Sequence, residues 1–384
     1  MCGYIFSTVT NKKKFLSLKK YIIHRGPDNQ NYKNINNCHL YHSRLKIIDI
    51  KSRSNQPFTD KEKNFYLLFN GEIYNYLELK KKFDIKINTS SDTEILFYLL
   101  KNIGLKKTLS EIRGMFSFVF YNIKKNTIEC ARDHFGQKPL YYTINNIFSC
   151  STNIKPLTKL IKRTSLDKDC VEFYLNSASI IPINKTLFKD ILVLPAGNYL
   201  KYNLDTKKII VKEYFHPSDL ISKNFNLILS KKNSSFLEKS LKSKISKAIK
   251  YCLISDVKVG TLLSGGIDSS IVTYFAKKID PEITSFTGIS EGIEKIPKKI
   301  VPKIIKKINL KNPKFIKHSY IDYLKKLQEL ITTSYNPFRW GGLVPMSKIC
   351  EIAKKNKVKV LLSGDGVDEI CGGYKTFSNI DLSI

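Results

Sequence analysis

Residues Val257–Ser270 read VKVGTLLSGGIDSS: an apolar stretch typical of a buried strand, a serine- and glycine-rich loop, and the start of a helix. Backbone N–H groups at such a loop, together with the helix N-terminus, form a cradle for an anion, and Gly265-Gly266 let the backbone approach a phosphate closely. Asp268 lies in the same loop, and a carboxylate beside a phosphate needs a cation, which indicates Mg²⁺. The loop is not a Walker A motif, because no Gly-Lys-Ser/Thr sequence follows.

A second acidic loop follows the apolar run Val358–Leu362 and reads SGDGVDE over residues 363–369. Open α/β sheets bind ligands at the carboxyl ends of their strands, where both loops are expected to lie. From residue 235 onward, strand-like and helix-like patterns alternate, which predicts a doubly wound parallel sheet. The expected elements are helices over 235–252, 268–278, 295–307, 320–333 and 345–356 and strands over 257–263, 283–286 and 358–362, with Pro297 and Pro302 breaking or starting the third helix.

The first 205 residues predict a different architecture, stacked antiparallel sheets with a few helices. Short β-rich segments are separated by turn signals such as Asn70-Gly71 and Asn145-Asn146. Ser91 and Glu94 have the spacing of a capping box, which predicts a helix from Asp92 to Lys101. The expected strands are 65–69, 115–121, 127–131 and 140–143. This change of pattern predicts a first domain over 2–205, a linker over 206–234 and a second domain over 235–384.

The composition excludes several classes of protein. A hydrophobic share of 42% excludes a wholly disordered chain, and the sequence contains neither a membrane-spanning apolar stretch nor a secretory signal. The net charge is +32, but it comes mostly from lysines spread along all 384 residues, which is typical of a compositional bias. The alternative, a basic nucleic-acid-binding module, predicts steeply salt-dependent binding. Eight cysteines without a CxxC pair argue against zinc and fit buried thiols in a reducing cytoplasm.

Cys2 is a candidate nucleophile. Removal of Met1 would leave a thiol and a free α-amine, with an ordinary pKa of about 8, on one residue. The amine could then accept the thiol proton directly or through a water, as in the enzymes that use an N-terminal threonine. By itself, a cysteine at position 2 more often has no catalytic role. The other motifs in the sequence therefore decide whether Cys2 is interpreted as a nucleophile.

Cys2 is followed by a series of short sequence motifs: HRGPD at 24–28, HSRL at 42–45, NGE at 70–72, SDTE at 91–94, RDHFG at 132–136 and LPAG at 194–197. The series resembles the class-II (N-terminal nucleophile) glutamine amidotransferase family over essentially all of residues 2–200. The resemblance implies an Ntn-type αββα fold in which Cys2 attacks the side-chain amide of glutamine. It also implies an oxyanion hole made by Asn70 and Gly71. The glutamine-binding residues implied are Arg44, Leu45, Ile48, Asn70, Gly71, Glu72 and Asp92.

Each of these residues also has an ordinary interpretation. Asn70-Gly71 is a common hairpin turn, Asp92 suits a helix start, and Arg44 could be a surface charge. In the functional interpretation, Arg44 grips the glutamine carboxylate through two hydrogen bonds, and Asp92 and Glu72 hold the ammonium. Arg25 and Asp28 are expected to support the pocket structurally.

The string SGG-x-DSS resembles the pyrophosphate loop of ATP pyrophosphatases, which cleave ATP between its α and β phosphates. The resemblance implies Asp268 and Asp368 as Mg²⁺ ligands and Asp365 as an acid near the adenylate or the incoming amine. Some relatives carry Glu at the position of Asp365. The ATP-binding residues implied are Leu263, Ser264, Gly265, Gly266, Asp268, Ser269, Ser270, Thr287, Ser363 and Gly364. Tight turns with solvated acids are the structural alternative.

The two halves together resemble the glutamine-hydrolysing asparagine synthetases. The resemblance implies a cytoplasmic enzyme that uses ATP, Mg²⁺ and glutamine to amidate aspartate through an acyl-AMP, giving asparagine, glutamate, AMP and pyrophosphate. Two alternatives stay open: another acceptor carboxylate, such as a sugar acid of a surface polysaccharide, or a glutaminase-only or regulatory chain.

Two departures from the family concern the acceptor. The chain ends ten residues after Tyr374, where relatives continue, so the second domain is expected to be truncated. The partners left open are a second copy of this chain, as a homodimer, or a separate polypeptide that supplies the missing segment. Arg339 lies where many relatives carry an acidic pair before proline, and it could read the acceptor carboxylate or pair with a nearby acid. Neither a specific nucleic acid nor a membrane is expected as a partner.

Overall fold

The computed structural model divides the chain into two compact units. The described residues of the first unit are 1–161, 164–177, 181–220 and 331–334; those of the second are 234–290, 295–330 and 342–374. Arg339, and with it the hypothesis of an acceptor ligand, lies outside the described residues, as do residues 221–233 of the predicted linker and the last ten residues of the chain.

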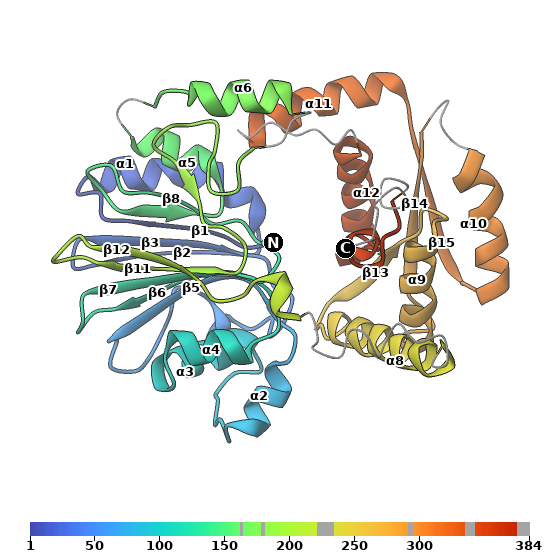
Figure 1. Cartoon of the computed structure of the whole chain (residues 1–384), viewed down its shortest axis with the longest axis horizontal. Helices are drawn as coiled ribbons and strands as arrows, with labels where there is room; N and C mark the ends of the chain where they lie inside the picture. The colour runs from blue at the N-terminus through green and yellow to red at the C-terminus, as the bar shows by residue number, and fades with distance from the viewer. Residues whose placement is uncertain (162–163, 178–180, 221–233, 291–294, 335–341, 375–384) are drawn as a thin grey trace, which may run out of the picture. The chain divides into compact units, whose positions relative to one another are not determined.

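The first unit contains two stacked antiparallel sheets between helices, which is the predicted Ntn-type arrangement (Figure 1). Sheet A has the order β10 (Leu192–Val193), β8 (Tyr141–Thr143), β9 (Ser149–Ser151), β1 (Gly3–Ser7), β3 (Cys38–Arg44) and β2 (Asn29–Ile35). Sheet B has the order β12 (Ile209–Glu213), β11 (Asn198–Asn203), β7 (Thr127–Arg132), β6 (Gly114–Asn122), β5 (Phe65–Ile73) and β4 (Phe58–Thr59).

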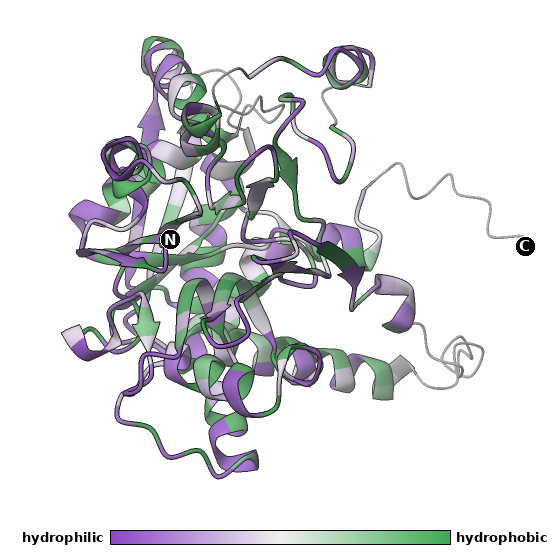
Figure 2. Cartoon of the chain, turned by 90° about the vertical axis from the view of Figure 1, so that its left-hand side faces the viewer, coloured by the Kyte–Doolittle hydropathy of each residue, from purple (hydrophilic) through white to green (hydrophobic). Residues whose placement is uncertain are grey.

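Helices cover the outer faces of both sheets. On the side of sheet A lie α1 (Lys12–Ser17), α5 (Ile154–Leu160) and α6 (Lys168–Asn176), and on the side of sheet B lie α2 (Tyr76–Lys82), α3 (Asp92–Asn102) and α4 (Leu105–Glu111). Short 3₁₀ turns connect the elements: η1 (Leu18–Tyr21), η2 (Ile23–Arg25), η3 (Ser52–Ser54) and η4 (Pro217–Leu220). In Figure 2, the helices of the chain carry both hydrophilic and hydrophobic residues, as helices with one buried face do.

The core of the first unit explains why β1 is a rigid base for Cys2. Tyr4 and Phe6 of β1 pack between the two sheets, while Ile5 packs under α1 and α5 on the other face. All five residues of β1, Gly3–Ser7, are buried. Burial of a large apolar side chain contributes about 1.5–3 kcal/mol, so the strand that begins directly after Cys2 is held on both faces.

Three local predictions for the first unit were wrong. Asn70-Gly71 is not a turn, because β5 continues to Ile73 and pairs with β6 along its whole length. Ser91 caps α3 by accepting the Thr93 N–H, but Glu94 accepts N–H groups of residues 88 and 89, so the capping box is not formed. The predicted linker begins too early, since β12 pairs with β11 inside sheet B.

The second unit is the predicted doubly wound parallel sheet. Its strands have the order β15 (Asn312–His318), β14 (Thr284–Ser290), β13 (Lys258–Leu262) and β16 (Val358–Leu362), all parallel. Its helices are α8 (Ser234–Cys252), α9 (Ile267–Ile279), α10 (Lys295–Ile308), α11 (Tyr320–Ser334), α12 (Leu343–Lys355) and α13 (Val367–Cys371), except that residues 331–334 of α11 belong to the first unit. One core joins α8, α9 and α10 to one face of the sheet, and a second core joins α12 to the other face.

Two features of this unit differ from the prediction. β15 was not predicted; it is an edge strand, a position where proline is tolerated, and it contains Pro313. Pro302 lies inside α10 and does not break it. Val301 and the partly buried Ile304, Ile305 and Ile308 of the same helix pack into the core, and this tertiary packing offsets the local cost of the proline.

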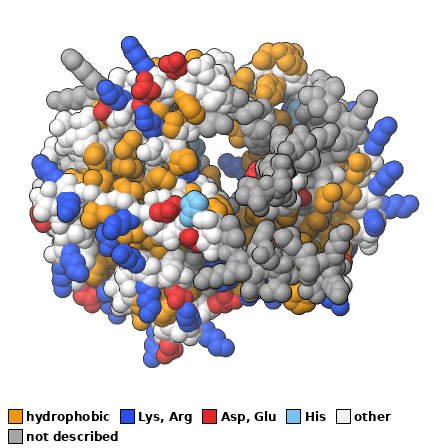
Figure 3. Space-filling model, in the orientation of Figure 1, with side chains coloured by type: hydrophobic (Ala, Val, Ile, Leu, Met, Phe, Trp, Pro, Cys, Tyr) orange, Lys and Arg blue, Asp and Glu red, His pale blue; other side chains and the backbone are white. Residues whose placement is uncertain are grey.

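Surface and thiol chemistry add three observations. Lysine and arginine side chains are spread over the visible surface of the described residues (Figure 3). Within the described ranges, no helix has the length and apolarity needed to cross a membrane.

Four of the free cysteines are buried as expected (Cys38, Cys130, Cys150 and Cys170). Cys350 and Cys371 are exposed, which corrects the prediction of buried thiols for these two residues.

Candidate active sites

Cys2 lies at the start of β1, beside the end of β3. The Leu45 N–H donates to Cys2 Sγ at 3.4 Å, and the thiol points to the Leu45 carbonyl at 3.7 Å. Arg25 Nε donates to the Cys2 carbonyl at 3.0 Å, so Arg25 supports the nucleophile through its backbone. Burial raises the pKa of the Cys2 thiol, and the neighbouring amino terminus partly opposes this. The resting thiol therefore needs a base before it can attack.

Asn70 presents an unused amide to the same cavity. Its side chain is 0% exposed, and neither Oδ1 nor Nδ2 has a hydrogen-bond partner among the described residues. A buried amide without a partner costs roughly 1–3 kcal/mol, so the site carries this cost in the absence of a ligand. An oxyanion bound here would accept from Nδ2.

Gly71 allows a close approach of two strands beside Asn70. A Cβ on Gly71 would lie 2.1 Å from the Met115 carbonyl oxygen and 2.7 Å from Phe116 Cα. Across the same pair of strands, a Cβ on Gly114 would lie 2.0 Å from the Glu72 carbonyl oxygen. Only glycine fits at either position, so β5 and β6 meet with little space between them at the cavity.

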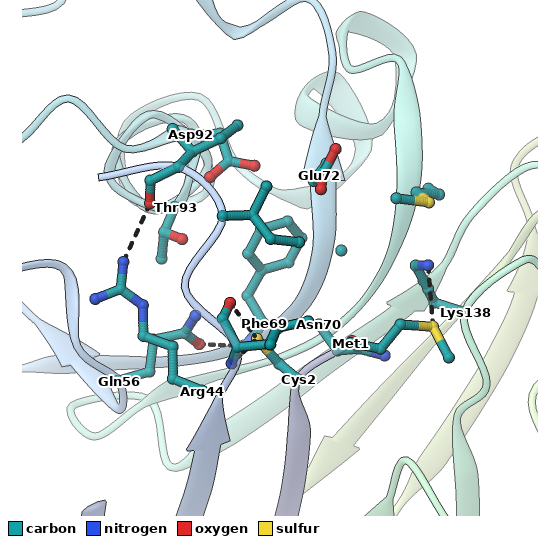
Figure 4. Close-up of a pocket in the computed structure, with 15 residues that line it drawn as sticks. Met1, Cys2, Arg44, Gln56, Phe69, Asn70, Glu72, Asp92, Thr93 and Lys138 are labelled. Carbon is teal, nitrogen blue, oxygen red and sulfur yellow. Dashed lines mark hydrogen bonds between the residues drawn. The ribbon is translucent and has the colours of Figure 1, made fainter. Parts of the chain in front are cut away.

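Two buried carboxyl groups, Glu72 and Asp92, line the cavity above Asn70 (Figure 4). Burial, and then the charge of Asp92, raises the pKa of Glu72 to about 7. Burial also raises the pKa of Asp92 to about 6, although Asp92 Oδ2 accepts the Ile73 N–H at 2.9 Å. Glu72 Oε1 has no partner among the described residues. A cationic ligand would satisfy both acids.

Arg44 does not have the free guanidinium that was predicted. Its Nη1 donates to the Lys51 carbonyl and to Asn55 Oδ1, both at 2.9 Å. Its Nη2 donates to the carbonyls of Ile48 and Asp49 at 3.1 and 2.5 Å. Four of its five N–H donors therefore organise the loop 48–55, and the predicted two-bond grip on a carboxylate is not available in this structure. Arg44 shapes the wall of the cavity through that loop.

Lys138 is a cavity residue that the sequence analysis did not identify. It is 6% exposed, and its Nζ lies 3.1 Å from Met1 Sδ (Figure 4). Burial lowers the pKa of the Met1 amine to about 6, and the charges of Arg25 and Lys138 act in the same direction. The buried surroundings therefore favour the uncharged form of the terminal amine. No local signal marked Lys138, because lysines are abundant throughout the chain.

The predicted residues of the first site therefore come together around one cavity of about 50 Å³, with Met1 among its lining residues. Those that line it are Cys2, Arg44, Leu45, Ile48, Asn70, Gly71, Glu72 and Asp92. Lining residues that were not predicted include Gln56, Thr93, Met115 and Lys138.

The second site lies where β13 and β16 end. Gly266 caps α9, and Gly265 has φ +93°, a conformation that favours glycine. The two loops are in contact, because a Cβ on Gly364 would lie 2.8 Å from Asp268 Cβ and 2.9 Å from the Ser269 backbone nitrogen. Ser269 Oγ donates to the Gly266 carbonyl and lies 3.0 Å from Ser264 Oγ, so the hydroxyls close the loop on itself.

A cavity of about 670 Å³ lies over these loops. Predicted residues that line it are Leu263, Ser264, Gly266, Asp268, Ser269, Ser363, Gly364, Asp365 and Asp368. Gly265, Ser270 and Thr287 are not among the lining residues; Thr287 is buried and its hydroxyl donates to the Leu263 carbonyl at 2.7 Å. Unpredicted lining residues include Met346, Glu369 and Tyr374.

The acids of the second site suit a divalent cation shared with phosphates. Burial, followed by the charges of Asp368 and Glu369, raises the pKa of Asp268. Clustered negative charge of this kind is relieved by a cation. Within the described ranges, no three His, Cys, Asp or Glu side chains are grouped as a complete metal site. Mg²⁺ is usually held by one or two carboxylates together with substrate phosphates.

Comparison with family models divides the chain as its structure does. Residues 1–215 match a glutamine amidotransferase domain, and residues 240–383 match an asparagine synthase domain.

Comparison with curated proteins finds relatives along nearly the whole chain. The chain is 33% identical to a putative asparagine synthetase (glutamine-hydrolyzing) 2 of Methanocaldococcus jannaschii, over 99% of this chain and 76% of the relative. It is 30% identical to asparagine synthetase (glutamine-hydrolyzing) 1 of Bacillus subtilis, over 98% of this chain but only 59% of the relative. Among solved structures, glutamine phosphoribosylpyrophosphate amidotransferase from B. subtilis is similar with a TM-score of 0.42 and 13% identity, over 82% of this chain and 90% of that one.

Proposed function

The chain belongs to the family of glutamine-hydrolysing asparagine synthetases, and from this premise we propose that it releases ammonia from glutamine at Cys2 and uses it for ATP-dependent amide synthesis in its second unit. One observation carries the first half of the proposal: the buried Asn70 amide lines the Cys2 cavity with both its polar atoms unpartnered. A pre-formed donor that lacks a ligand is what acyl transfer requires.

In this proposal, the base is the α-amine of Cys2 after Met1 is removed. The amine takes the thiol proton, and the sulfur attacks the amide carbon of glutamine. The protonated amine then gives that proton to the leaving nitrogen, and the carbon–nitrogen bond breaks to release ammonia and leave a glutamyl thioester. Water then hydrolyses the thioester to glutamate. Burial lowers the pKa of the present Met1 amine to about 6, and burial of a Cys2 amine would act in the same direction. Met1 removal also takes away a side chain that lines the cavity.

Asn70 Nδ2 and the Gly71 N–H would donate to the oxyanion of the tetrahedral intermediate. We expect Asn70→Ala to lower the kcat of glutamate release by about 10²–10³-fold, since the substrate carbonyl gains its full negative charge only in the transition state. Steady-state kinetics of glutamate release would measure this.

Asn75→Ala is the matched control for Asn70→Ala. Asn75 is also buried, but its amide binds the backbone of Glu111 and Arg113 at 2.9 and 2.8 Å. Its loss should lower the melting temperature without a comparable loss of kcat. Equal losses of kcat in both variants would argue against the oxyanion role.

Glu72 and Asp92 would hold the ammonium of glutamine. The loop that Arg44 organises would contribute to binding the carboxylate, with backbone groups in place of the predicted guanidinium grip. A zwitterionic amino acid would bring its ammonium to two buried acids that have no salt-bridge partner among the described residues.

This arrangement predicts a pH dependence of glutamine binding. The pKa values of Glu72 and Asp92 are raised to about 7 and about 6, so both are neutral below these values. The neutral forms contribute stability that is fully present below the ordinary carboxyl pKa of about 4 and is lost progressively as the pH rises to 6–7. The ammonium of glutamine would offset this loss, because it binds the ionised acids. We expect glutamine to raise the melting temperature of a Cys2→Ala variant by several degrees more at pH 8 than at pH 5.5.

Glu72→Gln is the control for this prediction, because an amide at this position does not titrate. The double variant Cys2→Ala/Glu72→Gln should lose a large part of the pH dependence. Equal shifts of the melting temperature at both pH values in Cys2→Ala would contradict the assignment.

In the second unit, the phosphates of ATP would bind to the loop between β13 and α9. The donor set fits Mg²⁺, with Asp268 and Asp368 as the ligands; the ion would neutralise charge that develops as pyrophosphate leaves. The acceptor carboxylate would attack the α-phosphorus to give an acyl-AMP, and ammonia would displace AMP. Asp365 lines the same cavity and could orient the amine.

Aspartate is the acceptor we propose, giving asparagine, glutamate, AMP and pyrophosphate. The names of the relatives support it. Another carboxylate, such as a sugar acid, and a glutaminase-only chain are the alternatives, since this chain spans 59% of the B. subtilis relative.

A paired assay on the 384-residue chain tests the proposal. Glutamate release from glutamine and pyrophosphate release from Mg-ATP with aspartate would be followed separately. Both are expected. Release of glutamate without pyrophosphate would support glutamine hydrolysis at Cys2 but not amide synthesis from aspartate. A panel of sugar acids would then test other acceptors. Absence of glutamate release would overturn it.

A further inference from the structure

The strand that carries the oxyanion donors lacks a neighbouring strand on one edge. β4 is only Phe58–Thr59 and pairs with Leu67 and Tyr66 of β5. Beyond Leu67, β5 is paired with β6 alone. In an antiparallel ladder, the N–H and C=O of every second residue point to the same edge. Phe69 and Gly71 therefore turn their backbone groups to the edge that β4 has left open.

Two buried side chains replace the missing strand at Phe69. Gln56 Oε1 accepts the Phe69 N–H at 2.6 Å, and His42 Nε2 lies 3.0 Å from the Phe69 carbonyl oxygen. Gln56 and His42 are both buried. They come from different elements, since His42 belongs to β3 and Gln56 follows η3. Both polar groups of the Phe69 backbone are therefore held by side chains from outside sheet B.

The proton on His42 can be assigned from this contact. A carbonyl oxygen only accepts, so Nε2 must carry the hydrogen. Nδ1 has no hydrogen-bond partner among the described residues, and burial lowers the pKa of His42 to about 3. The ring is thus neutral and donates one hydrogen bond to the backbone. Its second nitrogen is buried without a partner, which is a cost the fold tolerates at this position.

The next residue on the open edge is Gly71. Its N–H points to the same open edge as that of Phe69, and Phe69, Asn70 and Gly71 all line the Cys2 cavity. We propose that His42 and Gln56 are positioning residues that hold the Phe69 peptide so that the Asn70 amide and the Gly71 N–H converge on one oxyanion. The inference rests on the proposed glutaminase function, and it assigns a role to two residues outside the predicted site.

The test compares His42→Leu with two other variants of the full chain. His42→Leu should lower the kcat of glutamate release by about 10–100-fold, less than the loss of a donor itself, with KM changed by less than about twofold. His42→Gln keeps an N–H donor at a similar reach and should recover most of kcat. His39→Leu is the control, because His39 is buried on the same strand but faces Phe15 and Tyr32 on the opposite side.

Two further measurements distinguish a positioning role of His42 from a general disruption of the site. Alkylation of Cys2 by iodoacetamide displaces iodide and forms no oxyanion, so its rate should be the same in His42→Leu and the unmodified sequence. Hydrogen exchange of the peptide that covers residues 66–73 should be faster in His42→Leu and in Gln56→Met, but not in His39→Leu.

The inference is overturned if alkylation slows in parallel with kcat, if His39→Leu loses as much kcat, or if exchange over 66–73 is unchanged. A chain that releases no glutamate in any form would overturn the proposed function instead. In that case, the exchange measurement alone still decides whether His42 and Gln56 hold Phe69.

Discussion

Replacing Cys2 by alanine is expected to abolish glutamate release from glutamine, a fall on the order of 10⁴-fold or more. The thiol is the only nucleophile in the predicted set, and without it the Asn70 amide has no tetrahedral intermediate to stabilise. Ammonia supplied in the buffer should still support any pyrophosphate release, because that chemistry belongs to the second unit. Coupled assays for glutamate and for pyrophosphate would measure both effects.

Cys170→Ala is the matched control for the loss of a thiol. Cys170 is also buried in the first unit, but it lies in α6 and outside the cavity of Cys2. Its replacement should leave the rate of glutamate release within about twofold of the rate of the unmodified sequence.

Measurement of the intact mass is an independent check, since active protein should lack Met1. Active protein that retains Met1 would contradict the role of the Cys2 amine as base.

Asp368→Asn is expected to lower acceptor-dependent pyrophosphate release by about 10²–10³-fold. A metal ion at a phosphoryl centre contributes several kcal/mol of charge stabilisation, and each 1.4 kcal/mol corresponds to a factor of ten. The charge of Asp368 also acts on Asp268, whose pKa it helps to raise. Removing that charge should let Asp268 ionise more easily but leave the cation with one carboxylate ligand. Titration of the rate with Mg²⁺ should show a weaker apparent affinity.

Asp280→Asn is the control in the same unit. Asp280 is exposed at the end of α9 opposite to the phosphate loop, and its carboxylate accepts the Glu282 N–H at 3.0 Å. Its replacement should leave pyrophosphate release unchanged. The double variant Asp268→Asn/Asp368→Asn should lose little more than either single variant, because both residues would hold one ion under the proposed function. Unaltered Mg²⁺ dependence in Asp368→Asn would argue against the metal assignment.

Much of this protein could be predicted from contiguous residues. The string at 257–270 contains its own strand, loop and helix, so the nature of the second unit follows from local chemistry. The same holds for Ser91, which caps α3 by bonding two residues ahead. Cys2 and Asn70 could be identified as candidates because nucleophilic and amide groups are recognisable by type. In each case, the determining interactions span only a few residues along the chain.

The tertiary structure decided how those groups are used. Asn70-Gly71 has the local signal of a turn, but pairing with β6 makes it part of a strand. Arg44 could have gripped a carboxylate, yet loop 48–55 engages its terminal nitrogens. His42 and Gln56 meet at Phe69, and Lys138 reaches the cavity of Cys2 from 136 positions along the chain. These contacts depend on which strands are neighbours and on their register, and local sequence patterns carry little information about pairing between distant segments.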